Sequence, residues 1–196
     1  MTYELIVVGA SLGGLRALEV LLAGLPVDAG VAIAVAQHRS ADSTRGSLES
    51  MLQQHTKMPV LEAGDKEAIV PGHVYVAPAD YHLLVEPGSF ALSVDARVQF
   101  ARPSIDVLFE SAADAYGERL VGIVLTGANA DGAAGLSVVK RRGGVAVVQE
   151  PATAEARVMP EAALKLTAAD AVLPLEEIGA FVHGLCLPVA DRSPAA

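Results

Sequence analysis

The sequence predicts a three-layer α/β domain, in which helices cover both faces of a doubly wound, mainly parallel β-sheet. Apolar runs typical of buried strands alternate along the chain with segments of helical periodicity, as in successive βαβ units. Hydrophobic residues make up 52% of the chain, but only 4% are aromatic and none is Trp. Val, Ala, Leu and Ile must therefore form the core, which suits buried parallel strands.

The expected elements follow one another at regular spacing. The first half contains strands at 4–8 and 31–37, helices at 13–23 and about 44–54, and the short strand-like segments PVLEA, HVYVAP, YHLLVE and FALSV. The last two segments flank Pro87-Gly88 and are expected to form an antiparallel β-hairpin. The second half contains helices at 103–116, about 132–142, after Pro160 and at about 175–185, with strands at 120–125, 145–148 and 171–174. Residues 1–187 are expected to form one domain, followed by a disordered tail at 188–196.

Composition excludes several classes of function. The net charge of −9 and the scattered basic residues argue against a nucleic-acid partner. No apolar run reaches the roughly 18 residues of a membrane span, so membrane insertion is not expected. The first strand begins at residue 4, which leaves no room for a signal peptide. The single cysteine, Cys186, lies in an apolar setting and is expected in the core; we expect a cytoplasmic protein.

Three expected strands end in polar residues of catalytic type. The first runs into Ser11, the second into His38, and the strand at 120–125 into a loop that contains Asp131. The carboxyl ends of parallel strands meet at one edge of a sheet, where sites of such folds form. A serine nucleophile, an imidazole base and an acid that orients the base are the components of a hydrolytic triad.

Each of these residues also has a structural interpretation. The spacing Gly9-Ala10-Ser11-Leu12-Gly13 matches the nucleophile elbow G-x-S-x-G, but Ser11 is equally suited to capping the next helix. His38 is consistent with an ordinary loop residue, and Asp131 is well placed as the N-cap of the helix at 132–142. It is their joint occurrence at one edge that favours catalysis.

Ligand-binding alternatives have weaker support. A dinucleotide-binding loop would need glycine where Ser11 stands, and the lysine of a phosphate-binding P-loop is absent. Neither an H-E-x-x-H motif nor a cysteine-rich spacing is present, so no metal and no cofactor are expected.

Together, these segments resemble the catalytic domain of the CheB family of chemotaxis protein-glutamate methylesterases. The resemblance covers about residues 4–185. It is carried by IVVGASLGGLRALEVLLAGLP, AVAQH, GHVYVAPADYHLLVE, RPSIDVLFESAADAYGERLVGIVLTG, ADGAAGL and QEPATAEARVMPEAAL. Several long motifs in the same order make it specific.

The resemblance implies a serine hydrolase that removes γ-methyl esters from glutamates of chemoreceptors and also deamidates certain glutamines. It assigns Ser11 as nucleophile, His38 as general base and Asp131 as the acid that orients His38. The implied partners are the methylated cytoplasmic helices of chemoreceptors and other chemotaxis signalling proteins. Backbone N–H groups near Leu12 are candidates for oxyanion stabilisation, and Arg102 of the RPSID motif is a candidate substrate contact.

Departures from the family pattern leave alternatives open. The family commonly has threonine where this chain has Leu12, and T-G-M-G-x-D-G where this chain has Ala128 and Asn129 in place of the methionine and second glycine. Leu12, Ala128 and Asn129 are candidate oxyanion or substrate residues, and pocket shape and specificity are expected to differ around them. The chain shows no receiver domain before the first strand, so we expect a stand-alone esterase or else a piece of a larger system. The alternatives are a catalytically weak or inactive scaffold and a nucleotide-binding domain.

Overall fold

The computed structural model describes residues 3–25, 30–40 and 46–186. Its centre is a seven-stranded sheet in which every neighbouring pair of strands is parallel. In spatial order the strands are β3 (Val60–Glu62), β4 (Val74–Val76), β2 (Ala32–Gln37), β1 (Leu5–Ala10), β7 (Leu120–Val124), β8 (Val145–Gln149) and β9 (Ala171–Leu173). A separate antiparallel hairpin consists of β5 (His82–Glu86) and β6 (Ser89–Ser93). The predicted doubly wound α/β class and the hairpin are confirmed.

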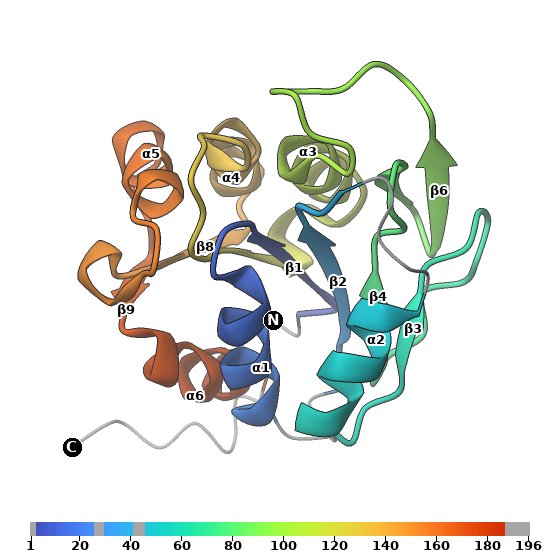
Figure 1. Cartoon of the computed structure of the whole chain (residues 1–196), viewed down its shortest axis with the longest axis horizontal. Coiled ribbons are helices and arrows are strands. Elements are labelled where there is room, and N and C mark those ends of the chain that lie inside the picture. Colours follow the sequence, from blue (N-terminus) through green and yellow to red (C-terminus); the bar gives the residue numbers. More distant parts are fainter. Residues whose placement is uncertain (1–2, 26–29, 41–45, 187–196) are drawn as a thin grey trace.

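Helices cover both faces of the sheet, which gives the expected three layers (Figure 1). One face carries the helices α1 (Gly14–Ala23), α2 (Ser47–Leu52) and α6 (Leu175–Cys186). The other face carries α3 (Ile105–Tyr116), α4 (Ala133–Arg141) and α5 (Val158–Leu166). Within the described residues, short 3₁₀ turns lie at Gln53–His55, Gly117–Arg119 and Pro151–Thr153.

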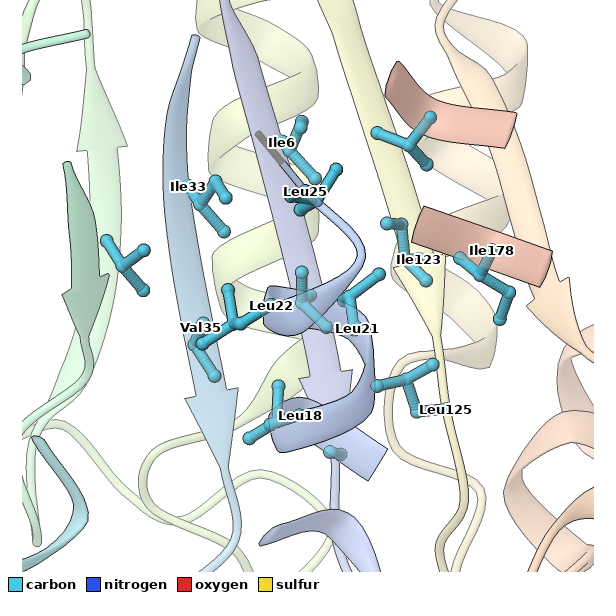
Figure 2. Close-up of a cluster of buried hydrophobic side chains, with 14 of the residues drawn as sticks. Ile6, Leu18, Leu21, Leu22, Leu25, Ile33, Val35, Ile123, Leu125 and Ile178 are labelled. Carbon is cyan, nitrogen blue, oxygen red and sulfur yellow. The ribbon is translucent and has the colours of Figure 1, made fainter. Parts of the chain in front are cut away.

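Successive side chains of each strand point to opposite faces of the sheet, so the core forms two clusters. In β1, Ile6 and Val8 face the cluster under α1 and α6, whereas Leu5 and Val7 face the cluster under α3 and α4. Figure 2 shows Leu18, Leu21 and Leu22 of α1 packed among side chains of β1, β2 and β7. The apolar side chains on both faces of β1 explain why this strand reads as a continuous apolar run.

Several helix boundaries differ from the sequence-based expectation. The helix expected at about 44–54 ends at Leu52, and two other helices start at a different residue. The helix expected at 103–116 begins at Ile105, because Ser104 is its N-cap and its hydroxyl accepts a hydrogen bond from Val107 N–H. Pro103 therefore precedes the cap rather than lying in the first turn. The helix expected after Pro160 begins earlier, at Val158, with Pro160 in its first turn, where a proline needs no N–H donor.

Some expectations concern residues that the structure does not describe. Positions 44–45 of the helix expected at about 44–54 and the tail expected at 188–196 lie outside the described residues. The expected core position of Cys186 is confirmed. None of the helices in the described ranges is long and apolar enough to cross a membrane.

Candidate active site

The carboxyl ends of β1, β2 and β7 lie side by side, and backbone hydrogen bonds continue to join the chain segments just beyond them. His38 N–H donates to the carbonyl of Ala10 at 3.0 Å, and Ser11 N–H donates to the carbonyl of Thr126 at 3.0 Å. The first residue after β1 is thus tied to the loop after β7, and the first residue after β2 is tied to the end of β1. This arrangement places the predicted Ser11, His38 and Asp131 at one edge of the sheet.

Ser11 is not the cap of the helix that follows it. The N-cap of α1 is Gly13, with φ of 76° and no side-chain capping bond. The capping interpretation of Ser11 is therefore wrong. Half-buried Ser11 and His38 share a surface hollow of about 570 Å³, which Leu12 and Glu155 also line. Among the described residues, no hydrogen bond joins the Ser11 hydroxyl to His38.

Gln37, the last residue of β2, holds the two loops together. Its Nε2 donates to the carbonyl of Ser11 at 2.9 Å and to the carbonyl of His38 at 3.0 Å. One amide group therefore spans the backbone on both sides of the hollow. The same side chain closely approaches Gly14, where a Cβ would lie 2.0 Å from Gln37 Oε1.

His38 forms a short hydrogen bond with Asp131. Its Nε2 lies 2.7 Å from Asp131 Oδ2, with the His38 side chain 13% exposed and the Asp131 side chain fully buried. Because an ionised carboxylate only accepts, Nε2 carries the proton of this bond, and Nδ1 of the neutral ring is left as the acceptor.

Asp131 does not cap the helix that follows it, contrary to the structural interpretation of the sequence. The N-cap of α4 is Gly132, which makes no side-chain capping bond. The Asp131 carboxylate instead accepts from the N–H groups of Ile105 and Asp106, at 2.7 and 2.9 Å, and from the Ser104 hydroxyl at 2.9 Å. It is therefore bound at the N-terminus of α3, where an anion is favoured.

Two neighbouring carboxyl groups respond differently to this setting. Burial opposes the ionisation of Asp131, but hydrogen bonds from His38 and from backbone N–H groups of Asp106 and Ile105 outweigh it and lower its pKa. Burial dominates at Asp106 and, together with the charge of Asp131, raises the pKa of Asp106 despite hydrogen bonds from Gly135, Gln99 and Gly132. The arrangement therefore favours Asp131 as the charged partner of His38.

The loop after β7 carries two of the predicted oxyanion or substrate residues. Ala128 is exposed on this loop. Half-buried Asn129 directs its side chain at the imidazole, with Nδ2 3.3 Å from His38 Nδ1. No positive φ occurs at Asn129, so the backbone here does not require the glycine of the family pattern.

Leu12 and Arg102 each line a hollow that His38 also lines. The Leu12 side chain is 56% exposed, and its carbonyl accepts from the Thr126 hydroxyl at 2.9 Å. Arg102 lines a second hollow of about 390 Å³, together with His38 and Asn129. Most of its guanidinium donors bind Asp80 and the carbonyls of Val94 and Asp95. Arg102 is thus near His38, but largely engaged within the protein.

Sequence reasoning missed four residues that shape this edge. They are Gln37, Ser104, Asp106 and Thr126. Gln37 was visible as the polar residue before His38, and Ser104 and Asp106 lie within RPSID, so the motifs contained them without revealing their contacts. Within the described part of the chain, no group of three or more His, Cys, Asp or Glu residues could hold a metal ion.

Comparison with known proteins shows the family of this chain. The family model described as CheB methylesterase matches residues 6–182. The chain belongs to the CheB methylesterase family. The CheB methylesterase catalytic domain of Thermotoga maritima has the same fold, with a TM-score of 0.88 and 32% identity; the match covers 94% of this chain and 100% of that one.

Two CheB relatives illustrate the range of chain lengths. A protein of Leptospira interrogans is 48% identical over 179 residues, which cover 91% of this chain and 92% of that protein. It is provisionally named a protein-glutamate methylesterase/protein-glutamine glutaminase. A protein of Anaeromyxobacter dehalogenans with the same activity name is 44% identical over 175 residues, or 89% of this chain but 51% of that protein.

Proposed function

We propose that this chain is a serine esterase that removes γ-methyl esters from glutamate side chains of chemoreceptors. The observation that carries the proposal is the short bond between His38 and Asp131 beside a serine that caps no helix. Membership of the CheB family and the activity named for its relatives support the substrate class. The names of the relatives also support glutamine deamidation as a second activity.

The proposed reaction uses Ser11 as nucleophile and His38 as base. The Ser11 hydroxyl transfers its proton to His38 Nδ1 while Oγ attacks the ester carbonyl. The tetrahedral intermediate then expels methoxide, which takes the proton from His38 and leaves as methanol. Water hydrolyses the glutamyl ester by the same route, which restores Ser11. Asp131 remains ionised and stabilises the imidazolium, in keeping with its lowered pKa.

Leu12 N–H is the proposed donor to the oxyanion. It lies just before the N-cap of α1, and within the described residues neither a backbone nor a side-chain acceptor binds it. A donor that is free in the resting site and placed at a helix N-terminus suits a charge that develops during reaction. Because the donor is a backbone group, leucine in place of threonine leaves it available. Ala128 and Asn129, on the loop after β7, stay candidate substrate contacts.

The proposed partners, cellular location and substrate contact follow from the proposed substrate. We propose methylated cytoplasmic helices of chemoreceptors as the protein substrate and other chemotaxis signalling proteins as further partners. This substrate places the enzyme in the cytoplasm. Arg102, which lines a hollow together with His38, is the proposed contact for the substrate backbone or a neighbouring side chain.

The decisive experiment compares Ser11→Ala with wild type in methanol release from methylated chemoreceptor membranes. Loss of the nucleophile should lower release by at least about 10³-fold. Ser50→Ala is the matched control, because Ser50 is an exposed serine on α2 and should leave release unchanged. A serine-directed fluorophosphonate should label wild type and Ser50→Ala but not Ser11→Ala. Methanol release that survives Ser11→Ala would refute the proposal, and an unlabelled wild type would favour the inactive scaffold.

A further inference from the structure

The base of the proposed reaction already has a hydrogen-bond partner in this structure. Asn129 Nδ2 lies 3.3 Å from His38 Nδ1, and the other ring nitrogen binds Asp131. Both nitrogens of the imidazole are therefore engaged, although no bond to the Ser11 hydroxyl is present among the described residues.

The orientation of the Asn129 amide follows from its second contact. Asn129 Oδ1 accepts from the backbone N–H of Asp131 at 3.3 Å. An N–H group can only donate, so the oxygen must face Asp131 and the NH₂ group must face His38. Since His38 Nε2 donates to Asp131, Nδ1 accepts from Asn129.

A neutral imidazole has one acceptor lone pair, in the plane of the ring at its unprotonated nitrogen. Ser11 must donate to this same lone pair when its proton is removed. The Asn129 amide and the Ser11 hydroxyl therefore compete for one position.

We propose that Asn129 holds His38 in a resting state by occupying the lone pair that accepts the Ser11 proton, and that substrate displaces it. The proposal rests on the esterase function proposed above. It makes Asn129 a positioning residue that acts through His38. Asn129 and His38 both line the hollow of about 390 Å³, so a substrate group that enters there reaches the amide. An acceptor oxygen on that group would draw the amide protons away from the ring.

The first test is ¹⁵N NMR of histidine-labelled protein, with His38→Gln used to assign the His38 signals. The Nδ1 shift of His38 should move in Asn129→Ala, because the lone pair loses its donor. Superimposable His38 signals in wild type and Asn129→Ala would overturn the proposal.

The charged groups around His38 remain in place in this comparison. They come from α1, from the second residue after β2, from the segment before α3, from α3, from the loop before α4 and from the loop before α5, and they are Arg16, Arg39, Arg97, Arg102, Asp106, Asp131 and Glu155. A difference between wild type and Asn129→Ala therefore reports the amide.

The second test is the rate at which a fluorophosphonate labels Ser11. Asn129→Ala and Asn129→Gly should label about two- to tenfold faster than wild type, the range that corresponds to one ordinary hydrogen bond. Ala130→Gly is the matched control for loop flexibility, because Ala130 is exposed on the same loop, and it should label at the wild-type rate. Slower or unchanged labelling of Asn129→Ala would contradict the proposal.

The two tests separate this proposal from the esterase assignment. If Ser11 of wild type does not label while the His38 Nδ1 signal still moves in Asn129→Ala, the esterase function fails and the Asn129 bond stands. If Ser11 labels in every variant at one rate and the His38 Nδ1 signal does not move, the esterase function stands and the resting-state role fails.

Discussion

Asp106 of α3 binds the N-terminus of α4, and Asp131, just before α4, binds the N-terminus of α3. Asp131, just before α4, accepts from the N–H groups of Ile105 and Asp106 in the first turn of α3. Asp106, in that turn of α3, accepts from the N–H groups of Gly132 and Gly135 at the start of α4, at 2.9 and 2.7 Å. Asp106 takes the place of a local cap at α4, whereas Asp131 adds to the Ser104 cap of α3, and together they fix the start of one helix against the start of the other.

Removing the Asp106 carboxylate should therefore destabilise the protein. Asp106→Ala leaves two buried N–H groups of α4 without an acceptor, which costs about 1–3 kcal/mol each and gives a lower free energy of unfolding in urea. Asp106→Asn retains an oxygen for Gly132 and Gly135 and should lose less. Asp114→Asn, an exposed residue of the same helix, serves as control. Equal stability of Asp106→Ala and Asp114→Asn would show that the reciprocal capping contributes nothing.

The lowered pKa of Asp131 predicts a pH-dependent contribution to stability. Because the pKa in the folded state lies below its ordinary value of 3.8, this contribution is fully present above that value and is lost as the pH falls through the folded pKa. Asp131→Asn turns an NH₂ group toward Ile105 N–H and His38 Nε2–H, so it should cost about 1–3 kcal/mol at pH 7. Urea unfolding at pH 7, at pH 3 and at lower pH should show that the difference in free energy of unfolding between wild type and Asp131→Asn shrinks in acid. A difference that does not depend on pH would contradict this prediction.

The sheet and the position of the site were predictable because each depends on a local pattern. Parallel strands buried on both faces must be apolar, as Ile6 and Leu5 on opposite faces of β1 illustrate. Once the strands were recognised, Ser11, His38 and Asp131 followed from the rule that carboxyl ends share an edge. Helix starts were less predictable, since a proline suits several positions near an N-terminus.

The partners of the site residues could not be predicted in this way. Asp131 immediately precedes a helix, and local rules make such a residue its cap. Only the packing of α3 beside α4 offers it the N–H groups of Ile105 and Asp106 instead. The contact between Asn129 and His38 depends likewise on side-chain directions in two separate loops, which hydrophobic periodicity does not encode.

Gln37 should influence activity more than stability. Replacing it with leucine removes the amide that binds the carbonyls of Ser11 and His38. Two part-buried bonds at about 1 kcal/mol each predict a modest loss of stability. The loops that carry Ser11 and His38 would no longer be held together, so labelling of Ser11 should slow by about tenfold or more. Fluorophosphonate kinetics and urea unfolding measure both effects, with the exposed Gln54→Leu as control. Unchanged labelling would show that the strands alone set the spacing.

Gly9 and Ile105 show how the sheet positions the acid. A Cβ at Gly9 would lie 2.3 Å from Ile105 Cγ2, and one at Gly132 would lie 2.6 Å from the same atom, so Ile105 fits closely between two glycines. Gly9→Ala should push away the first turn of α3, which donates to Asp131, and should cost about 1–3 kcal/mol with slower labelling of Ser11. Gly184→Ala is the control, because a Cβ there meets nothing within 4 Å, and an alanine within α6 should stabilise by up to about 1 kcal/mol.

A double-mutant cycle distinguishes this collision from a general weakening of β1. Ile105→Ala removes the atom that the new methyl group would strike, at the expense of a cavity. Gly9→Ala should therefore cost clearly less in the Ile105→Ala background than in wild type, and the difference between the two costs is the coupling energy. Urea unfolding of the four proteins gives this energy. Additive effects of the two substitutions would mean that Gly9 is needed for β1 itself and does not position α3.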